Sequence, residues 1–173
     1  FRSGETFSNG NLKSFGHFKN LLGFKGIVIS GDINDKKALK ELEHDYNFDY
    51  IFHQAAISDT TASEQDLMIK TNVNAYEDLL KIAINHGANM IYASSAATYG
   101  DSDRFEVGFE QPNNAYGFSK VMMDNISYKY IKKGVDISIV GLKYFNVYGP
   151  REFFKNKTAS MVVQFGHQIL KGG

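Results

Sequence analysis

The sequence has no cysteine among its 173 residues. Disulfide bonds, thiolate metal sites and a cysteine nucleophile are therefore excluded. The absence is compatible with a reducing cytoplasm, which is the location we expect. The histidines do not have the spacing of metal ligands, so we expect no bound metal. The five histidines are His17, His44, His53, His86 and His167.

An excess of charge of one sign is missing as well. Nineteen basic and nineteen acidic residues give a formal net charge of zero. This balance argues against a general nucleic-acid binder or a membrane-surface binder. No run approaches the ~18 apolar residues that a membrane-spanning helix needs. A content of 43% hydrophobic and 22% charged residues is typical of a globular protein, and the length suits one domain.

The glycine pattern of a dinucleotide-binding domain is also missing. Such a domain carries G-x-G-x-x-G between its first strand and first helix, and the pattern occurs nowhere in this sequence. Either the protein binds no dinucleotide, or its first βα unit precedes Phe1. The chain begins without methionine and ends at Gly173 directly after a helix-like run. We therefore expect that it is cut from a longer protein.

Short apolar runs alternate with helical patterns along the chain. The predicted strands are 26–30, 50–52, 90–93 and 137–142. The predicted helices are about 12–21, a helix capped by Asp35, 64–86 ending at Gly87, and about 114–133 ending at Gly134.

This alternation predicts an α/β fold, a doubly wound parallel sheet with helices on both faces. A Rossmann-like fold read in this way lacks its first βα unit, and the family resemblance given below implies that a C-terminal substrate domain is missing as well. We assign residues 1–150 to an incomplete nucleotide-binding domain and 151–173 to the start of a substrate-binding region. Ligands of such sheets bind at the carboxyl ends of the strands. Polar segments follow the strands there, at 31–33, 53–61, 94–100 and 143–151.

Tyr116 and Lys120 lie four residues apart in the first turns of a predicted helix, so they share a face. Tyrosine is a poor base at neutral pH, and a nearby ammonium favours its phenolate form. Ser95, at the end of the preceding strand, is placed to orient a substrate oxygen. The spacing alone is weak evidence, because Tyr128 and Lys132 repeat it within the body of the helix.

Three motifs in this order resemble the extended short-chain dehydrogenases/reductases. They are Y-A-S-S-A-A-T-Y-G at 92–100, Y-G-F-S-K at 116–120 and K-Y-F-N-V-Y-G-P-R-E at 143–152. Within the family, H-Q-A-A at 53–56 and S-D-T-T at 58–61 resemble the nucleotide-sugar epimerases that act on an ADP-linked heptose. The resemblance implies a cytoplasmic NADP- or NAD-dependent enzyme of lipopolysaccharide precursor synthesis. It implies a homo-oligomer at full length, with a nucleotide sugar as substrate.

The resemblance also implies the roles of the catalytic residues. Tyr116 would be one acid/base, Lys120 would tune it and hold the nicotinamide ribose, and Ser95 would bond the reacting oxygen. Lys155 matches a second acid/base that works from the opposite face of the sugar, with Lys157 as a near competitor. Inversion at C6″ needs a proton donor on that second face.

Further residues would bind cofactor and substrate. The cofactor residues implied are Asp32 and Ile33 at the adenine, Ala55 and Ala56 along the pyrophosphate path, Asn72, Tyr116, Lys120, and Arg2 at a 2′-phosphate. The substrate residues implied are Ser58, Ser95, Asn146, Arg151 and Lys155. Asn72 can equally be a buried tie between a helix and a strand. Without the glycine pattern, we expect the 173-residue chain alone to be a poor enzyme.

Other functions stay open. A UDP-hexose 4-epimerase would use the same serine, tyrosine and lysine without a second lysine. A dehydratase would have an Asp-Glu pair where Ala96 and Ala97 stand, which disfavours that reaction. A non-catalytic ligand-binding module on the same fold is the third reading, and it would have no need of a proton-transfer set.

Overall fold

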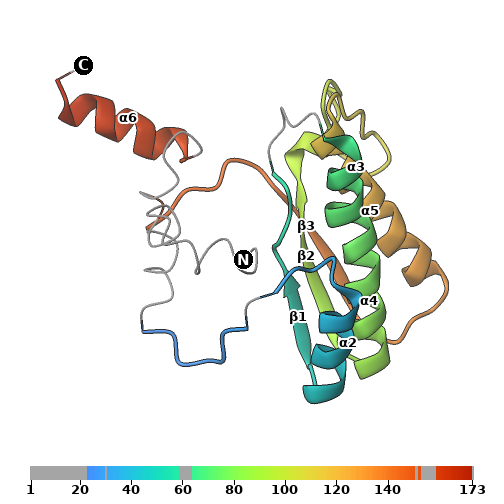
Figure 1. Cartoon of the computed structure of the whole chain (residues 1–173). Coiled ribbons are helices and arrows are strands. Elements are labelled where there is room, and N and C mark those ends of the chain that lie inside the picture. The colour runs from blue at the N-terminus through green and yellow to red at the C-terminus, as the bar shows by residue number, and fades with distance from the viewer. Residues whose placement is uncertain (1–22, 30, 59–63, 151, 153–158, 173) are drawn as a thin grey trace. The chain divides into compact units, whose positions relative to one another are not determined.

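The computed structural model describes residues 23–29, 31–58, 64–150, 152 and 159–172. The chain divides into two compact units (Figure 1). One comprises residues 33–145, and the other comprises 1–32 together with 146–173. The candidate catalytic residues Ser95, Tyr116 and Lys120 all belong to the first unit.

A parallel three-stranded sheet forms the centre of the 33–145 unit. Its strands β1 (Tyr50–His53), β2 (Asn89–Ser95) and β3 (Ile139–Tyr144) lie in the order β1-β2-β3. The register pairs His53 with Tyr92, and Ser95 with Tyr144. The three strands therefore end at one edge, and the predicted parallel α/β fold is confirmed.

Helices connect the strands, and their ends follow from local sequence. They are α2 (Lys36–Asp45), α3 (Gln65–Met68), the π-helical η1 (Ile69–Asn74), α4 (Ala75–His86), the 3₁₀ turn η2 (Ala96–Thr98) and α5 (Ala115–Lys132). The Asp35 side chain accepts hydrogen bonds from the first backbone N–H groups of α2. Gly87 takes φ 65° and ends α4, as predicted.

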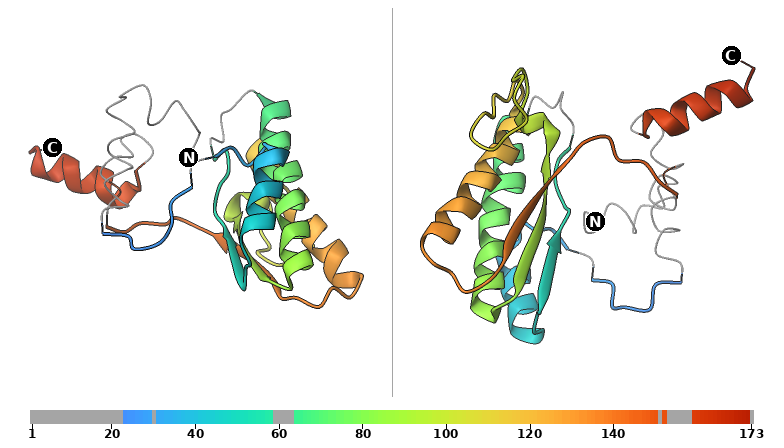
Figure 2. Two further views of the ribbon diagram at one scale, coloured as in Figure 1. Left: turned by 60° about the horizontal axis from the view of Figure 1, so that its bottom comes forward. Right: turned by 180° about the vertical axis from the view of Figure 1, so that it is seen from behind.

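The long helices of this unit, α2, α4 and α5, lie on one face of the sheet (Figures 1 and 2). The reason is geometric, because right-handed crossovers that advance in one direction place their helices on the same side. The predicted second layer of helices is not found within this unit. Its place is an apolar surface with exposed side chains of β1 and β3, namely Tyr50, Phe52, Val140, Leu142 and Tyr144.

The core lies between the sheet and α4 and α5. Its fully buried members include Tyr76, Leu80, Met90 and Met123. The Tyr76 hydroxyl lies 2.5 Å from Ser127 Oγ, which itself donates to the Met123 carbonyl. This pair satisfies two buried hydroxyls, so the tyrosine ring can pack in the core without an unpaired polar atom.

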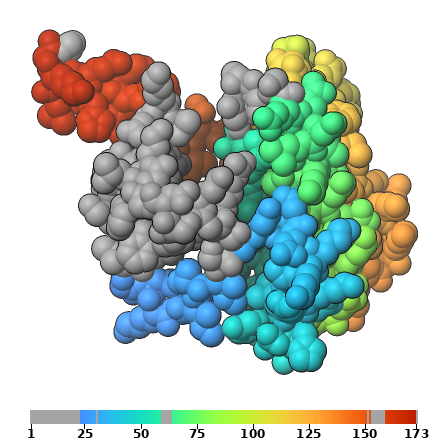
Figure 3. Space-filling model, viewed as in Figure 1, coloured from blue at the N-terminus to red at the C-terminus, as the bar shows by residue number. Residues whose placement is uncertain are grey.

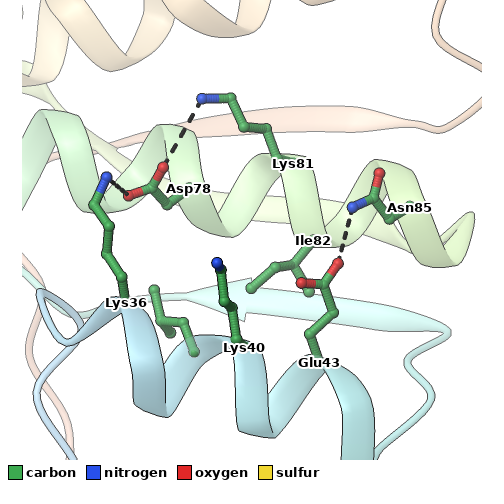
Figure 4. Close-up of a pocket in the computed structure, with 8 residues that line it drawn as sticks. Lys36, Lys40, Glu43, Asp78, Lys81, Ile82 and Asn85 are labelled. Carbon is green, nitrogen blue, oxygen red and sulfur yellow. Dashed lines mark hydrogen bonds and ion pairs between the residues drawn. The ribbon is translucent and has the colours of Figure 1, made fainter.

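Helix α2 packs beside α4 at the surface of this unit (Figure 3). Lys36 Nζ lies 3.2 Å from Asp78 Oδ2, and Asn85 Nδ2 donates to Glu43 Oε1 over 2.8 Å (Figure 4). These exposed contacts enclose a shallow pocket of about 190 Å³ between the two helices. Such exposed ion pairs contribute little stability, so the packing rests mainly on apolar contact along α2.

Two predicted strands need correction. Residues 26–29 form no strand, and Ile27, Val28 and Ile29 are exposed. Apolar β-branched residues form a strand only where a neighbour pairs with their backbone, and the described residues provide none here. Strand β3 begins at Ile139 rather than at 137, because Ser138 N donates to the Asn89 side chain before the ladder starts. The predicted helix at 12–21 lies outside the described residues.

The second unit contains α6 (Met161–Leu170). Ser160 caps this helix, and its backbone N–H donates to Glu152 Oε2 over 2.9 Å. Glu152 Oε1 also accepts from Gly149 N over 3.0 Å. In the part of the chain that the structure describes, no helix is long and apolar enough to cross a membrane.

Candidate active site at the carboxyl ends of the strands

The first turn of α5 places Tyr116 at the carboxyl edge of the sheet. Asn114 is extended and accepts a hydrogen bond from Gly117 N over 2.8 Å, so the helix starts at Ala115. Gly117 packs against η2 so closely that an added Cβ would lie 2.4 Å from the Ala97 carbonyl oxygen. Only glycine permits this approach, which brings Tyr116 next to the turn that follows Ser95.

Lys120 is the most unusual residue of the site. Its side chain is 2% exposed, and Nζ donates to the Ala93 carbonyl over 2.7 Å. Nζ also lies 5.7 Å from the centre of the Tyr116 ring. Burial lowers the pKa of Lys120 to about 8, against the opposing influence of Asp124. The lysine is therefore held against the strand with two of its three N–H donors uncommitted among the described residues.

Ser95 ends β2 and begins η2. Its Oγ accepts from Ala97 N over 3.1 Å, and its carbonyl accepts from Thr98 Oγ1 over 2.8 Å. The hydroxyl proton of Ser95 donates to no described residue, so it is available to a ligand. A serine fixed at a strand end with a free proton is suited to orient a substrate oxygen.

Asn72 connects three segments of the site. Its side chain bonds both the N–H and the carbonyl of Ile57, at 2.8 and 2.9 Å, and donates to Ser119 Oγ over 3.0 Å. Ser119 Oγ donates in turn to the Tyr116 carbonyl over 2.7 Å. The π-helical turn η1 carries Asn72, and such turns often occur at functional sites. The structure thus shows the buried tie, and a cofactor contact by Asn72 stays a prediction.

His53 ends β1 and is buried beneath the site. Its ring centre lies 5.7 Å from that of Tyr76, and Nε2 has no hydrogen-bond partner among the described residues. Burial, aided by the charge of Lys120, lowers the pKa of His53 to about 4. The residue is therefore neutral at physiological pH.

The remaining predicted residues are less closely tied together. Ala55 and Ser58 are exposed and Ala56 is half-buried, in the segment that Asn72 holds. Ile33 is half-buried at the start of the same unit. Asp32 and Asn146 are exposed residues of the other unit. Arg2, Arg151, Lys155 and Lys157 lie outside the described residues.

The second tyrosine–lysine pair lies apart from this cluster. Tyr128 is 58% exposed, and Lys132 Nζ lies 4.5 Å above its ring. Its position in the body of α5 agrees with the interpretation that it is a solvated helix face. The structure also adds two residues that sequence reasoning missed, Asp124 and Lys143. Lys143 opens the third family motif, but no role followed from that position, and Asp124 was marked only by its place one turn after Lys120.

A sequence model of the NAD dependent epimerase/dehydratase family matches residues 5–173. The chain belongs to this family. A relative from Brachyspira hyodysenteriae named ADP-L-glycero-D-manno-heptose-6-epimerase is 35% identical over 171 residues, which are 94% of this chain and 52% of that protein. The chain thus spans about half the length of the curated relative it matches.

Solved structures of the family agree with this assignment. The Helicobacter pylori ADP-L-glycero-D-manno-heptose-6-epimerase is 55% identical, with a TM-score of 0.78, over 87% of this chain and 48% of that one. The Brucella ovis UDP-glucose 4-epimerase in complex with NAD is 30% identical, with a TM-score of 0.62, over 72% of this chain and 40% of that one. The expected Rossmann-like fold class is therefore confirmed.

The described residues fit one end of a nicotinamide cofactor. Lys120 and Ser95 offer unused donors, and the Asn72 tie holds the small residues Ala55 and Ala56 at the strand edge. The sequence offers no G-x-G-x-x-G loop for the pyrophosphate. The described residues would therefore hold the nicotinamide end of such a cofactor, and the pyrophosphate would need a glycine loop that this sequence does not contain.

Replacing Gly117 by alanine tests the close contact between α5 and η2. The new Cβ would meet the Ala97 carbonyl, so one of the two backbones must move. We expect a loss of about 1–3 kcal/mol in the free energy of unfolding by urea. Gly166→Ala is the matched control, because its Cβ meets nothing within 4 Å in α6. Equal effects of both substitutions would contradict the contact.

The pH dependence of stability tests the burial of His53. Its pKa is lowered to about 4 in the folded chain, so between pH 6.5 and 4 the unfolded chain binds the proton and the folded chain does not. Stability is then lost as the pH falls. Between pH 7 and pH 5 this residue should remove about 2 kcal/mol from the free energy of unfolding. In His53→Phe, the free energy of unfolding by urea should fall by about 2 kcal/mol less between pH 7 and pH 5 than in the unaltered chain. The same pH dependence in both proteins would refute the burial of His53.

Proposed function

We propose that the complete protein is a nucleotide-sugar epimerase that inverts C6″ of ADP-glycero-manno-heptose, using a bound NADP or NAD. The observation that carries the proposal is the grouping of Ser95, Tyr116 and Lys120 at the end of β2, with the ammonium buried. Two relatives that bear the name of this 6-epimerase, at 35% and 55% identity, support the choice of substrate. We place the enzyme in the cytoplasm, in lipopolysaccharide precursor synthesis, as a homo-oligomer.

The three residues would act together on one hydroxyl of the sugar. The Ser95 hydroxyl donates a hydrogen bond to the reacting oxygen of the sugar and so holds that oxygen in place. Tyr116 acts as the phenolate, which the ammonium of Lys120 stabilises, and it becomes neutral when it accepts the proton of that hydroxyl. The bound nicotinamide supplies a reversible hydride acceptor. Lys120 would hold its ribose with an unused N–H donor.

In this scheme, inversion at C6″ uses a second proton-transfer group on the opposite face of the sugar. We assign this role to Lys155, with Lys157 as the alternative. For the substrate we assign contacts to Ser58, Asn146 and Arg151. For the cofactor the assigned contacts are Asp32, Ile33, Ala55, Ala56, Asn72 and Arg2.

A UDP-hexose 4-epimerase is the second candidate. The 30% identity to the Brucella ovis UDP-glucose 4-epimerase favours it, because that reaction needs the same serine, tyrosine and lysine. It would need no second lysine. The two candidates therefore differ in whether loss of Lys155 abolishes inversion.

Tyr116→Phe in the complete protein tests the catalytic pair. The variant keeps the ring and removes the acid/base, so we expect kcat for ADP-heptose to fall roughly 10²–10⁴-fold. NMR of the C6″ configuration measures the reaction. Tyr128→Phe is the matched control, with the same substitution on the same helix, and should retain full activity. If both variants keep wild-type turnover, Tyr116 has no role in the chemistry.

Lys155→Ala tests the two-face scheme. We expect loss of inversion at C6″, while exchange of the C6″ hydrogen into the nicotinamide persists, because Tyr116 serves that half-reaction alone. Lys157→Ala should behave as wild type. Undiminished inversion in Lys155→Ala, with loss in Lys157→Ala, would transfer the role to Lys157. Undiminished inversion at C6″ in both would remove both lysines from the mechanism, whereas turnover of a UDP-hexose and not of ADP-heptose would favour the 4-epimerase alternative.

A further inference from the structure

A network of charged and polar side chains adjoins the candidate site. Its members are Lys143, Asp124, Glu110 and Thr98, and none of them has a role in the proposed reaction. At its centre Lys143 Nζ donates to Asp124 Oδ2 over 2.8 Å, to Thr98 Oγ1 over 2.9 Å and to Glu110 Oε1 over 3.1 Å. All three ammonium protons are thereby used. The side chains of Lys143, Asp124 and Glu110 are only 16%, 21% and 13% exposed, so the network is poorly screened by water.

Asp124 receives two further hydrogen bonds from β2. Tyr92 OH donates to Oδ1 over 2.8 Å, and Ser94 Oγ donates to Oδ2 over 3.0 Å. Tyr92 can lie there because β3 has a glycine opposite it: a Cβ at Gly141 would stand 2.5 Å from the Tyr92 hydroxyl. The carboxylate is therefore held by three hydrogen-bond donors, which come from two strands and not from its own helix.

Lys120 and Asp124 are neighbours one turn apart on α5, and both are bound to β2. Lys120 reaches the Ala93 carbonyl, while Asp124 reaches the side chains of Tyr92 and Ser94. Three successive strand residues are thus attached to α5, immediately before Ser95. Lys143 connects this network to Ser95. It donates to Thr98 Oγ1, which in turn donates to the Ser95 carbonyl.

The two ammonium groups, Lys120 and Lys143, are balanced by the two carboxylates of the network, Asp124 and Glu110. Lys120 has no ion-pair partner among the described residues. Lys143 neutralises one carboxylate, and Asp124 and Glu110 provide two. One negative charge is therefore left to face the buried ammonium of Lys120 from the next turn of the helix. The ionisable groups that contact Lys120 or act on its charge are His53 of β1 and Tyr116 and Asp124 of α5. The groups that act on or bond to Asp124 are Tyr76 of α4, Tyr92 of β2 and Lys143 of β3.

We propose that Asp124, held in place by Lys143, is a positioning residue that keeps Lys120 charged and fixes Ser95 beside it. This role rests on the proposed function only in so far as Lys120 serves catalysis. Burial and a carboxylate act on Lys120 in opposite directions, because burial disfavours the ammonium and Asp124 favours it. Without Asp124 the lysine would begin to lose its charge near neutral pH.

The test is a direct titration of Lys120 in the 173-residue chain. Lysines carrying ¹³C at Cε are followed by NMR against pH, and Lys120→Arg assigns the signal. We expect a midpoint near pH 8 in the unaltered chain. In Asp124→Asn, which keeps the shape of the side chain, the midpoint should fall by about one pH unit. An unchanged midpoint in Asp124→Asn would overturn the proposal.

Glu110→Gln is the matched control. It also removes one carboxylate from Lys143, but Glu110 lies outside α5 and is not a neighbour of Lys120. The titration midpoint of Lys120 should therefore not change in this variant. An equal fall in both variants would show a general charge effect and would also overturn the proposal. If Asp124→Asn does not fold, Asp124→Asn/Lys143→Met/Glu110→Gln removes all three charges of the network, so that none of its members is left as an unpaired buried ion. The midpoint should fall in that variant too.

Activity of the complete protein separates this proposal from the proposed function. If the protein is an epimerase, the alkaline limb of kcat/KM in Asp124→Asn should move to lower pH by the shift that NMR measures. A purely structural role would lower activity equally at all pH values. If no nucleotide sugar is turned over, the function is wrong while the titration result stands. A displaced titration with an unmoved pH limb would refute the catalytic part of the role.

Discussion

The buried ammonium of Lys120 is the constraint on which the rest of the site depends. An ammonium removed from water loses several kcal/mol of hydration, which the protein must offset with hydrogen bonds and opposite charge. Here the Ala93 carbonyl accepts one bond directly, and Asp124 supplies the charge from one turn away. Helix α5 must therefore meet β2 in a single register, since any shift along the strand would leave the charge without its acceptor.

Several local features follow from that register. Gly117 permits the start of α5 to touch η2, and the Asn72 tie attaches the same helix to the segment after β1. The site is thus built on a helix and strand ends rather than on long loops. Elements of this kind hold catalytic groups more precisely than loops do. The unpaired Ser95 proton and the spare donors of Lys120 are what this rigid frame presents to a ligand.

Sequence patterns predicted most of the 33–145 unit because its signals are local. Asp35 caps α2, Gly87 ends α4 and β1 starts at the predicted residue 50, since each depends on neighbours in the chain. The predicted strand at 26–30 failed for the opposite reason. A strand exists only when another one pairs with it, and an apolar run carries no information about whether that partner is present. The helices cover one face of the sheet because crossover geometry, rather than composition, places them.

The sequence by itself determined the residue types of the site: a tyrosine and a lysine at helical spacing after a strand that ends in serine. The sequence also favoured this pair over Tyr128 and Lys132, and the structure agrees with that choice, because Lys120 is buried and Lys132 is exposed. The tertiary structure also revealed Asp124 and Lys143. They lie 19 residues apart and meet only through the packing of α5 on β3. Charge balance in a buried region is a property of the assembled fold, since Coulomb interactions act across space and ignore order along the chain.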